Sequence, residues 1–196
     1  SLQNARQKGM QTDWSKVSIT KPSFLGTKTF LDYDLNELTR RIDWTPFFLT
    51  WEMKAKYPNI LTDPKLGVEA TKLFNDAKIM LKEIIAKKQL QANAIIGLYP
   101  ANSIGDDIEV YADDNRQKVI STLHSLRQQA LKTNAKPYLA QADFIAPKTS
   151  GIKDYIGVFA VTAGMGAEAL AAQYEAEHDD YRSIMVKALA DRLAEA

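Results

Sequence analysis

The chain of 196 residues is 45% apolar and 25% charged, which is typical of a soluble protein with one domain or a small pair of domains. Its 25 basic and 24 acidic residues nearly cancel, so no overall charge attracts it to nucleic acid or to an anionic membrane. The sequence contains no cysteine, which excludes disulfides, thiolate-bound zinc and a cysteine nucleophile. With only His124 and His178 present, a histidine-rich metal centre is excluded as well.

Targeting signals are not found in the sequence. The first residues are polar and do not contain the apolar segment of a signal peptide. The longest strongly apolar stretch, residues 155–167, is shorter than the roughly 20 residues that cross a bilayer. We therefore expect a cytoplasmic protein with no membrane partner. The chain has no initiator methionine and ends at Ala196 within a helical pattern, so we expect it to be a piece of a longer polypeptide.

The N-terminal part of the chain divides into an arm and the start of a folded domain. Residues 1–32 are polar and contain helix breakers, which predicts an arm or linker without a core of its own; residues 33–196 are the predicted domain. The first predicted helix begins at Asp34, which has Glu37 at capping-box spacing. A second helical segment begins at Thr45–Pro46 and is expected to end at Tyr57–Pro58.

The middle of the chain predicts one long helix and then strands. Apolar residues three and four apart predict a helix over residues 66–88. Residues 94–99 predict a short strand that Pro100 ends, and the alternation over residues 107–111 predicts a half-buried strand. Residues 118–126 fit a strand or a helix equally well.

The C-terminal part predicts one more strand and two helices. The apolar run over residues 155–162 predicts a buried strand, and the rest of the chain is helical with a break near His178-Asp179-Asp180. The predicted order runs from helices to short strands and back to helices. This order is typical of an α+β fold, whereas a parallel sheet would need strands and helices in regular alternation.

Three short motifs suggest chemistry but have simpler interpretations. Gly164-Met165-Gly166 is similar to a phosphate-binding loop, but no second strand follows and Glu168 adds a negative charge, so a strand-to-helix turn is favoured. The clusters 105–107 and 113–115 contain Asp106, Asp107, Asp113 and Asp114, but they do not have calcium-loop spacing and are interpreted as solvated turns. In a less favoured interpretation, Asp106 and Asp107 are two hydrogen-bond acceptors at the edge of a groove.

No catalytic group is evident from the residues alone. His178-Asp179-Asp180 is best explained as a helix start that the aspartates cap, because adjacent residues do not face each other on a helix. His124 has no obvious partner, and no serine lies in a nucleophile-elbow motif. We therefore expect no catalytic residue in this chain.

Asp43 is the most unusual candidate, because it lies between two predicted helices among aromatic residues. It is interpreted either as the N-cap of the second helix, which composition favours, or as a receptor for a cation. An ionised carboxylate there can accept charge-assisted hydrogen bonds from an ammonium group, and a neighbouring tryptophan can stack on an adenine ring or a sulfonium.

Residues 41–48, Arg-Ile-Asp-Trp-Thr-Pro-Phe-Phe, closely resemble the opening motif of the activation domain of cobalamin-dependent methionine synthase. The likeness continues in order through residues 67–70, 97–102, 105–108, 126–129, 142–147, 154–157, 178–181 and 187–196. Ordered matches from about residue 36 to the last residue are specific, whereas one motif would not be.

The resemblance implies a fold, an activity and partners. The fold is a twisted, mainly antiparallel sheet flanked by helices. The parent enzyme is a methyltransferase that passes a methyl group from methyltetrahydrofolate to homocysteine, with cobalamin and zinc bound in other modules. The activation domain binds S-adenosylmethionine and docks on the cobalamin-binding domain. With an electron from flavodoxin or a flavoprotein reductase, it supports the reductive methylation of cob(II)alamin. The domain supplies binding and placement, so the isolated chain is expected not to be catalytic.

Two carboxylates of the family's S-adenosylmethionine site match this sequence. Asp43 corresponds to the aspartate of the Asp-Trp-Thr-Pro motif, and Glu195 corresponds to the glutamate of the Arg-Leu-Ala-Glu-Ala motif. The family's Arg-x-x-x-Gly-Tyr segment follows the position of Glu195, and the sequence ends at Ala196 before it. We therefore expect an incomplete site, with weak or undetectable ligand binding by this chain alone.

Two other functions stay open at this stage. One is a docking module that contacts flavodoxin and the cobalamin domain without binding a ligand. The other is an independent nucleotide-binding enzyme that uses Gly164-Met165-Gly166.

Overall fold

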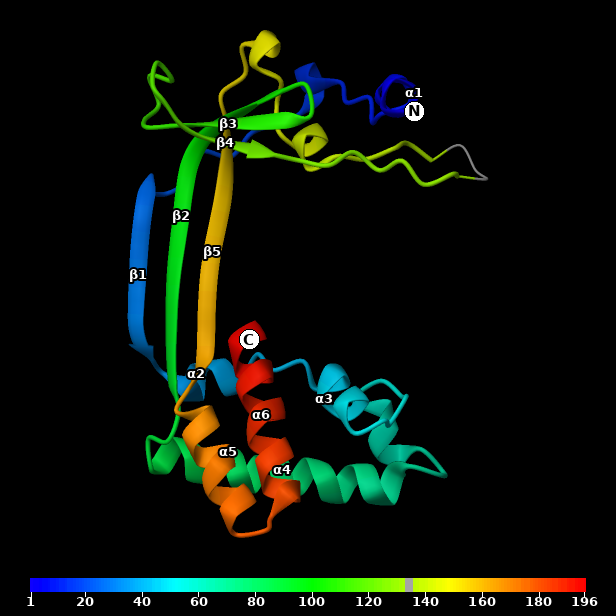
Figure 1. Cartoon of the computed structure of the whole chain (residues 1–196), viewed down its shortest axis with the longest axis vertical. Helices are drawn as coiled ribbons and strands as arrows, with labels where there is room; N and C mark the ends of the chain where they lie inside the picture. The colour runs from blue at the N-terminus through cyan, green and yellow to red at the C-terminus, as the bar shows by residue number, and fades with distance from the viewer. Residues whose placement is uncertain (133–135) are drawn as a thin grey trace. The chain divides into compact units, whose positions relative to one another are not determined.

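The computed structural model describes residues 1–132 and 136–196, and it confirms the predicted α+β class. Within these residues, five strands form one sheet in the order β1-β2-β3-β4, and β5 pairs with β2 (Figure 1). The strands are β1 (Gly26–Tyr33), β2 (Gln91–Ile104), β3 (Asp107–Tyr111), β4 (Val119–His124) and β5 (Asp154–Met165). The α-helices are α1 (Leu2–Gln7), α2 (Leu35–Thr39), α3 (Trp44–Thr50), α4 (Gly67–Ala86), α5 (Ala167–Ala176) and α6 (Asp180–Glu195). Short 3-10 helices are η1 (Trp14–Lys16), η2 (Asn59–Thr62), η3 (Gln141–Phe144) and η4 (Lys148–Ser150).

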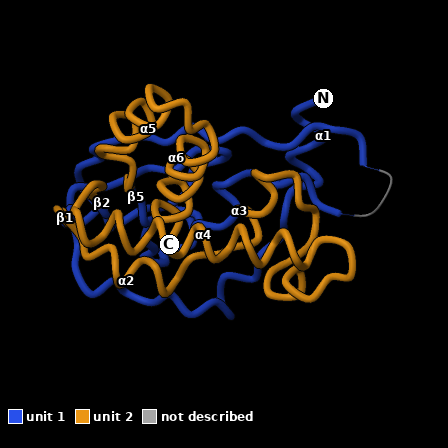
Figure 2. Tube along the Cα trace, turned by 90° about the horizontal axis from the view of Figure 1, so that it is seen from below, with its two compact units in different colours: residues 1–28, 96–159 blue, residues 29–95, 160–196 orange. Residues whose placement is uncertain are grey.

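Two compact units make up the chain, and each is assembled from two stretches of sequence (Figure 2). Unit 1 contains residues 1–28 and 96–159, and unit 2 contains residues 29–95 and 160–196. The predicted division into an arm and a domain follows a different boundary and stays a prediction. The strand β1, most of which lies within the predicted arm, was not predicted. No helix in the described part of the chain has both the length and the apolar character that crossing a membrane requires.

Unit 1 contains an antiparallel meander of β2, β3 and β4. The pairing joins Ser103 to Ile108 and Ile108 to Leu123, so the ambiguous stretch 118–126 forms a strand over Val119–His124 and not a helix. Its small core consists of Ala101, Ile108 and Ala142, with Ile145 and Ile156 packed against it. The residues of β4 are all exposed, and among the described strands β4 pairs with β3 only.

Two predictions about strands are wrong. β2 does not end at Pro100 but continues to Ile104. β2 pairs with β1, β3 and β5, but a strand has only two edges. One edge of β2 therefore pairs with different strands along its length. Pro100 directly precedes Ala101, where pairing with β3 begins, and a proline without an N–H is tolerated where a ladder is interrupted. The predicted buried strand is β5, but most of its side chains are exposed, including Phe159 at 75%. An apolar run does not reveal whether another layer covers it.

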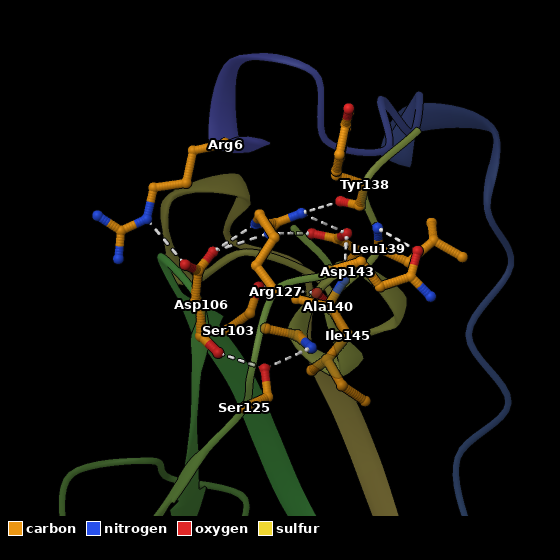
Figure 3. Close-up of polar contacts among 12 residues, drawn as sticks. Arg6, Ser103, Asp106, Ser125, Arg127, Tyr138, Leu139, Ala140, Asp143 and Ile145 are labelled. Atoms are coloured by element: carbon orange, nitrogen blue, oxygen red, sulfur yellow. Dashed lines mark hydrogen bonds and ion pairs between the residues drawn. The ribbon is translucent and has the colours of Figure 1, made fainter. Parts of the chain in front are cut away.

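A buried ion-pair network holds the loops of unit 1 together (Figure 3). Arg127 is 8% exposed and lies between Asp106 and Asp143. Its Nη2 is 2.6 Å from Oδ1 of Asp143, and its Nε is 2.8 Å from Oδ1 of Asp106. Arg6 of α1 donates to the other oxygen of Asp106 at 2.8 Å, and Arg127 also donates to the carbonyl of Tyr138. The interpretation of Asp106 as a solvated turn residue is therefore wrong.

The same network sets the charge of its members. Burial alone raises the pKa of Asp106 and of Asp143. Hydrogen bonds from Arg6 and Arg127 to Asp106, and from Arg127 and the N–H of Ala140 to Asp143, outweigh this effect and lower both pKa values below the usual value. A depressed folded-state pKa stabilises the fold above the unfolded value, and this contribution is lost as the pH falls through the folded value. Both carboxylates therefore stabilise unit 1 at neutral pH and stop doing so in acid.

Unit 2 packs helices around one hydrophobic core. α4 forms where the spacing predicted a helix, and it buries Ala70, Leu73, Ala77, Leu81 and Ile84. α6 contacts α2, α3, α4 and α5, so it is the element that all the other α-helices described in this unit share. Its buried residues include Met185, Val186 and Leu189.

Three helices of unit 2 end in the same way. At the ends of α3, α4 and α5, a residue in the left-handed region follows the C-cap: Glu52, Lys88 and His178. The N–H of the next residue then donates back to the last turn, as from Met53 to the carbonyl of Phe48. This is the Schellman motif, which usually has glycine at that position. The second helical segment therefore ends at Thr50, not at Tyr57–Pro58 as predicted, because Glu52 takes a role that sequence rules reserve for glycine.

The turn between β5 and α5 confirms the strand-to-helix interpretation of Gly164-Met165-Gly166. Gly166 has φ +95° and precedes α5, and a Cβ at this position would lie 2.3 Å from the carbonyl oxygen of Gln89. Both the dihedral angle and the close approach require glycine.

Replacing this glycine is expected to destabilise the protein. Gly166→Ala adds left-handed strain and a backbone clash, so we expect the free energy of unfolding to fall by about 3 kcal/mol or more. Gly105→Ala is the matched control. Gly105 has φ +62°, but a Cβ added there would meet no described atom within 4 Å, so only strain of about 1–2 kcal/mol applies. Urea denaturation followed by circular dichroism measures both, and equal losses would contradict the clash.

Removing the central arginine of unit 1 is expected to cost more than removing a surface arginine. Arg127→Met leaves Asp143, whose side chain is only 10% exposed, without its cation, so we expect a loss of about 3–5 kcal/mol. Arg40→Met is the control, because Arg40 pairs with Glu37 at 3.1 Å in an exposed setting that contributes under about 1 kcal/mol. Denaturation of both variants tests this, and a loss for Arg127→Met no larger than for Arg40→Met would show that the network contributes little.

Candidate functional site

Asp43 lies at the N-terminus of α3, where it caps the helix. Its Oδ1 accepts a hydrogen bond from the N–H of Thr45 at 2.9 Å, which confirms the capping interpretation. The residue is exposed, and within residues 1–132 and 136–196 its second carboxylate oxygen accepts no hydrogen bond. Asp43 therefore combines a structural role with one oxygen that is open to solvent.

The aromatic residues that follow Asp43 belong to the core. Trp44 is 9% exposed and packs edge-on against Phe47 and Phe74, with ring centroids 5.3 and 4.8 Å apart. The proposal that a neighbouring tryptophan stacks on an adenine or a sulfonium is therefore wrong for Trp44. Trp44 is instead buried against other rings of the core, which explains why the motif is rich in aromatic residues.

Glu195 is the last residue of α6 and is exposed. Both of its oxygens accept hydrogen bonds from Arg192, at 2.6 Å from Nη1 to Oε2 and at 3.0 Å from Nη2 to Oε1. The same guanidinium donates to Asp191 at 2.5 Å. The carboxylate of Glu195 is thus held by a partner on its own helix.

The fold brings the helices next to the two carboxylates into contact with one another. Asp43 lies in the link between α2 and α3, and α6 contacts both of these helices. In two views, the C-terminal end of α6 lies between α2 and α3 (Figure 1 and Figure 2). Within the described part of the chain, no hydrogen bond or ion pair links Asp43 to Glu195 directly.

Two clefts in the described part of unit 2 lie away from these carboxylates. One of about 350 Å³ is lined by Asp76, Glu83 and Tyr181, and a neighbouring one of about 340 Å³ by Trp51, Leu73 and again Asp76 and Tyr181. The Tyr181 hydroxyl donates to Asp76 at 2.9 Å, and burial together with this contact raises the pKa of Tyr181 to about 12. Neither Asp43 nor Glu195 lines these clefts.

The remaining polar candidates have structural roles. Asp179 caps α6, as predicted, and His178 is the left-handed residue that ends α5. His124 is exposed, but it has a partner that the sequence did not suggest, because its Nδ1 lies 3.0 Å from Asp107. Asp114 pairs with Lys21 at 2.7 Å. In residues 1–132 and 136–196, no group of three or more histidine, aspartate or glutamate residues is arranged to hold a metal ion.

Comparison with known proteins identifies the family. The family model described as the activation domain of vitamin B12 dependent methionine synthase matches residues 34–196. This chain belongs to that family. A crystal structure described as the MetH reactivation domain bound to AdoHcy superposes with a TM-score of 0.92 at 49% sequence identity. The alignment covers all of this activation domain and 59% of the solved chain, so the present chain spans about three-fifths of the length of that relative.

The family assignment leaves Asp43 and Glu195 as the candidate ligand contacts, and the structure adds one residue that sequence reasoning missed. Arg192 was part of a matched motif, but its burial beneath Glu195 was not predicted. A signal was present, because an arginine three residues before a glutamate on a helix lies on the same face. That spacing did not reveal that the arginine is buried.

The two roles of Asp43 can be separated by mutation. Asparagine caps helices as well as aspartate does, so Asp43→Asn is expected to leave the free energy of unfolding nearly unchanged, whereas Asp43→Ala is expected to lower it by about 1 kcal/mol. Chemical denaturation of both variants measures this. Equal stability of the alanine variant and the unmodified domain would show that the cap contributes nothing.

Proposed function

We propose that this activation domain binds S-adenosylmethionine through the carboxylates of Asp43 and Glu195, and that it places the ligand for the reductive methylation of cob(II)alamin in methionine synthase. One observation carries the proposal: a relative that is 49% identical over the whole chain is described as bound to AdoHcy, the demethylated form of the same ligand.

The chemistry of the two residues supports this choice. S-adenosylmethionine carries an ammonium and a sulfonium, so acidic partners suit it. The open oxygen of Asp43 can accept a hydrogen bond from the ammonium while the other oxygen keeps capping α3. The carboxylate of Glu195 is 63% exposed and retains further acceptor positions beside its bonds to Arg192. These side chains can bind and orient a cationic ligand without reacting with it.

The proposal divides the work between modules. The cobalamin of another module would supply the atom that accepts the methyl group, and this chain would supply placement. We further propose that the domain docks on the cobalamin-binding domain and on flavodoxin or a flavoprotein reductase, which would supply the electron to the cobalamin of the other module. The family's description names vitamin B12 dependence, which is consistent with the first of these partners, and the second rests on the resemblance alone. The expectation that the chain alone binds the ligand weakly stays a prediction.

The test uses the intact methionine synthase in which, as we propose, this chain is a domain. Asp43→Asn and Glu195→Gln each remove a charge at nearly constant shape, so we expect each to weaken binding of S-adenosylmethionine about 10- to 100-fold, the range for a hydrogen bond to a charged group. Isothermal titration calorimetry measures the affinity. Asp34→Asn is the matched control, because Asp34 caps α2 through a 2.9 Å bond to the N–H of Asn36 and is not part of the proposed site.

A result with no effect would favour another function. If Asp43→Asn and Glu195→Gln leave both the affinity and the reactivation at limiting S-adenosylmethionine unchanged, these carboxylates are not the ligand contacts; docking alone is favoured only if the unmodified enzyme also shows no measurable binding of S-adenosylmethionine. Unequal effects of the two variants on S-adenosylhomocysteine and S-adenosylmethionine would identify which carboxylate lies nearer the sulfonium, because only the second ligand carries that charge.

A further inference from the structure

Arg192 combines burial with exposed partners in a way that is unusual for a helix-end arginine. The residue is 6% exposed, while the side chains of Asp191 and Glu195 that it contacts are 67% and 63% exposed. The guanidinium therefore lies beneath the surface and holds two carboxylates at the surface. Both belong to the last turns of α6, which contacts α2 and α3 on either side of Asp43.

The contacts restrict both atoms of the Glu195 carboxylate. Nη1 of Arg192 donates to one oxygen at 2.6 Å and Nη2 donates to the other at 3.0 Å, so the pair is bidentate. A planar guanidinium fixes the plane of a carboxylate that it binds in this way, which an ammonium cannot do. Glu195 is thereby held in one orientation although its side chain is largely in solvent.

If Arg192 only stabilised α6, its burial would not be explained. A cation in the last turn of a helix is favourable, but this effect does not require the cation to be buried. Arg182, on the first turn of the same helix, shows the ordinary case: it is 54% exposed and approaches Asp179 at 3.5 Å through Nε. A buried guanidinium must keep its partners, because leaving it unpaired is costly.

Burial lowers the pKa of Arg192, and the hydrogen bonds to Glu195 and Asp191 more than reverse this effect, so the group stays charged. One arginine with two carboxylates leaves a net charge of −1 on this end of α6. The cluster is thus still suited to a cationic ligand after its internal pairing.

We infer that Arg192 is a positioning residue for the S-adenosylmethionine site, which preorganises the Glu195 carboxylate and does not itself contact the ligand. This inference rests on the proposed function and adds to it. Without Arg192, the carboxylate of Glu195 would have to lose rotamer freedom on binding, at a cost of about 0.5–1.5 kcal/mol for one such side chain.

The test is a double-mutant cycle in the intact enzyme. Arg192→Met keeps an unbranched apolar chain in the buried space and removes the donors, and we expect it to weaken S-adenosylmethionine binding about 3- to 10-fold by calorimetry. In the Glu195→Gln background, the same change is expected to have little further effect, because Arg192 acts through Glu195. Loss of stability alone would not produce this non-additivity.

Two further variants keep the result interpretable if Arg192→Met folds poorly. Arg192→Lys retains the charge without the bidentate geometry, and we expect an affinity between those of the unmodified enzyme and Arg192→Met. Arg182→Met is the matched control on the same helix and is expected to leave the affinity unchanged. Circular dichroism at the titration temperature verifies that each variant is folded.

The outcomes separate this inference from the proposed function. If Glu195→Gln and Asp43→Asn weaken binding but neither Arg192 variant does, the inference is overturned and the proposed function stands. If Arg192→Met weakens binding equally with Glu195 present or replaced, Arg192 does not act through Glu195, and the inference is again overturned. If neither Glu195→Gln nor Asp43→Asn has any effect, the proposed site fails, and this inference fails with it.

Discussion

A guanidinium that is withdrawn from water has to keep carboxylate partners, and each compact unit of this protein contains one such group. In unit 1, Arg127 joins Asp106 to Asp143 and so connects the β2–β3 turn to the loop before β5. In unit 2, Arg192 holds Asp191 and Glu195 on the last turns of α6. The difference lies in the partners: the side chains that Arg127 contacts are only 10–11% exposed, whereas those that Arg192 contacts are 63–67% exposed. The first arrangement therefore serves the fold, and the second presents acidic groups at the surface.

The proposed site consists of two acidic side chains that other parts of the chain hold in place. Asp43 is fixed by the helix that it caps, and Glu195 is fixed by a buried arginine, so both carboxylates are oriented before any ligand arrives. Preorganised acceptors reduce the entropy that binding has to overcome. This is the contribution expected of an activation domain, in which reactive chemistry belongs to a cofactor carried elsewhere in the proposed parent enzyme.

Local rules predicted the elements whose ends carry standard signals. Asp34, Asp43 and Asp179 cap helices as their sequence positions indicated, and the long apolar spacing of α4 predicted that helix nearly to its ends. The same rules failed where an ordinary residue takes a glycine's conformation, because Glu52 ends α3 and His178 ends α5 with positive φ. They failed also at Phe159, since an apolar side chain in a strand does not reveal whether another layer covers it.

The sequence by itself determined the α+β class, the family, and the two carboxylates that the family's ligand site implies, because these depend on residue types in a fixed order. Only the tertiary structure decided what lies around them. It assigned Trp44 to the core, placed the link that carries Asp43 and the end of α6 in one helical layer, and buried Arg192 under Glu195. Burial and contact between distant segments depend on how helices pack, and no spacing along a single helix contains that information.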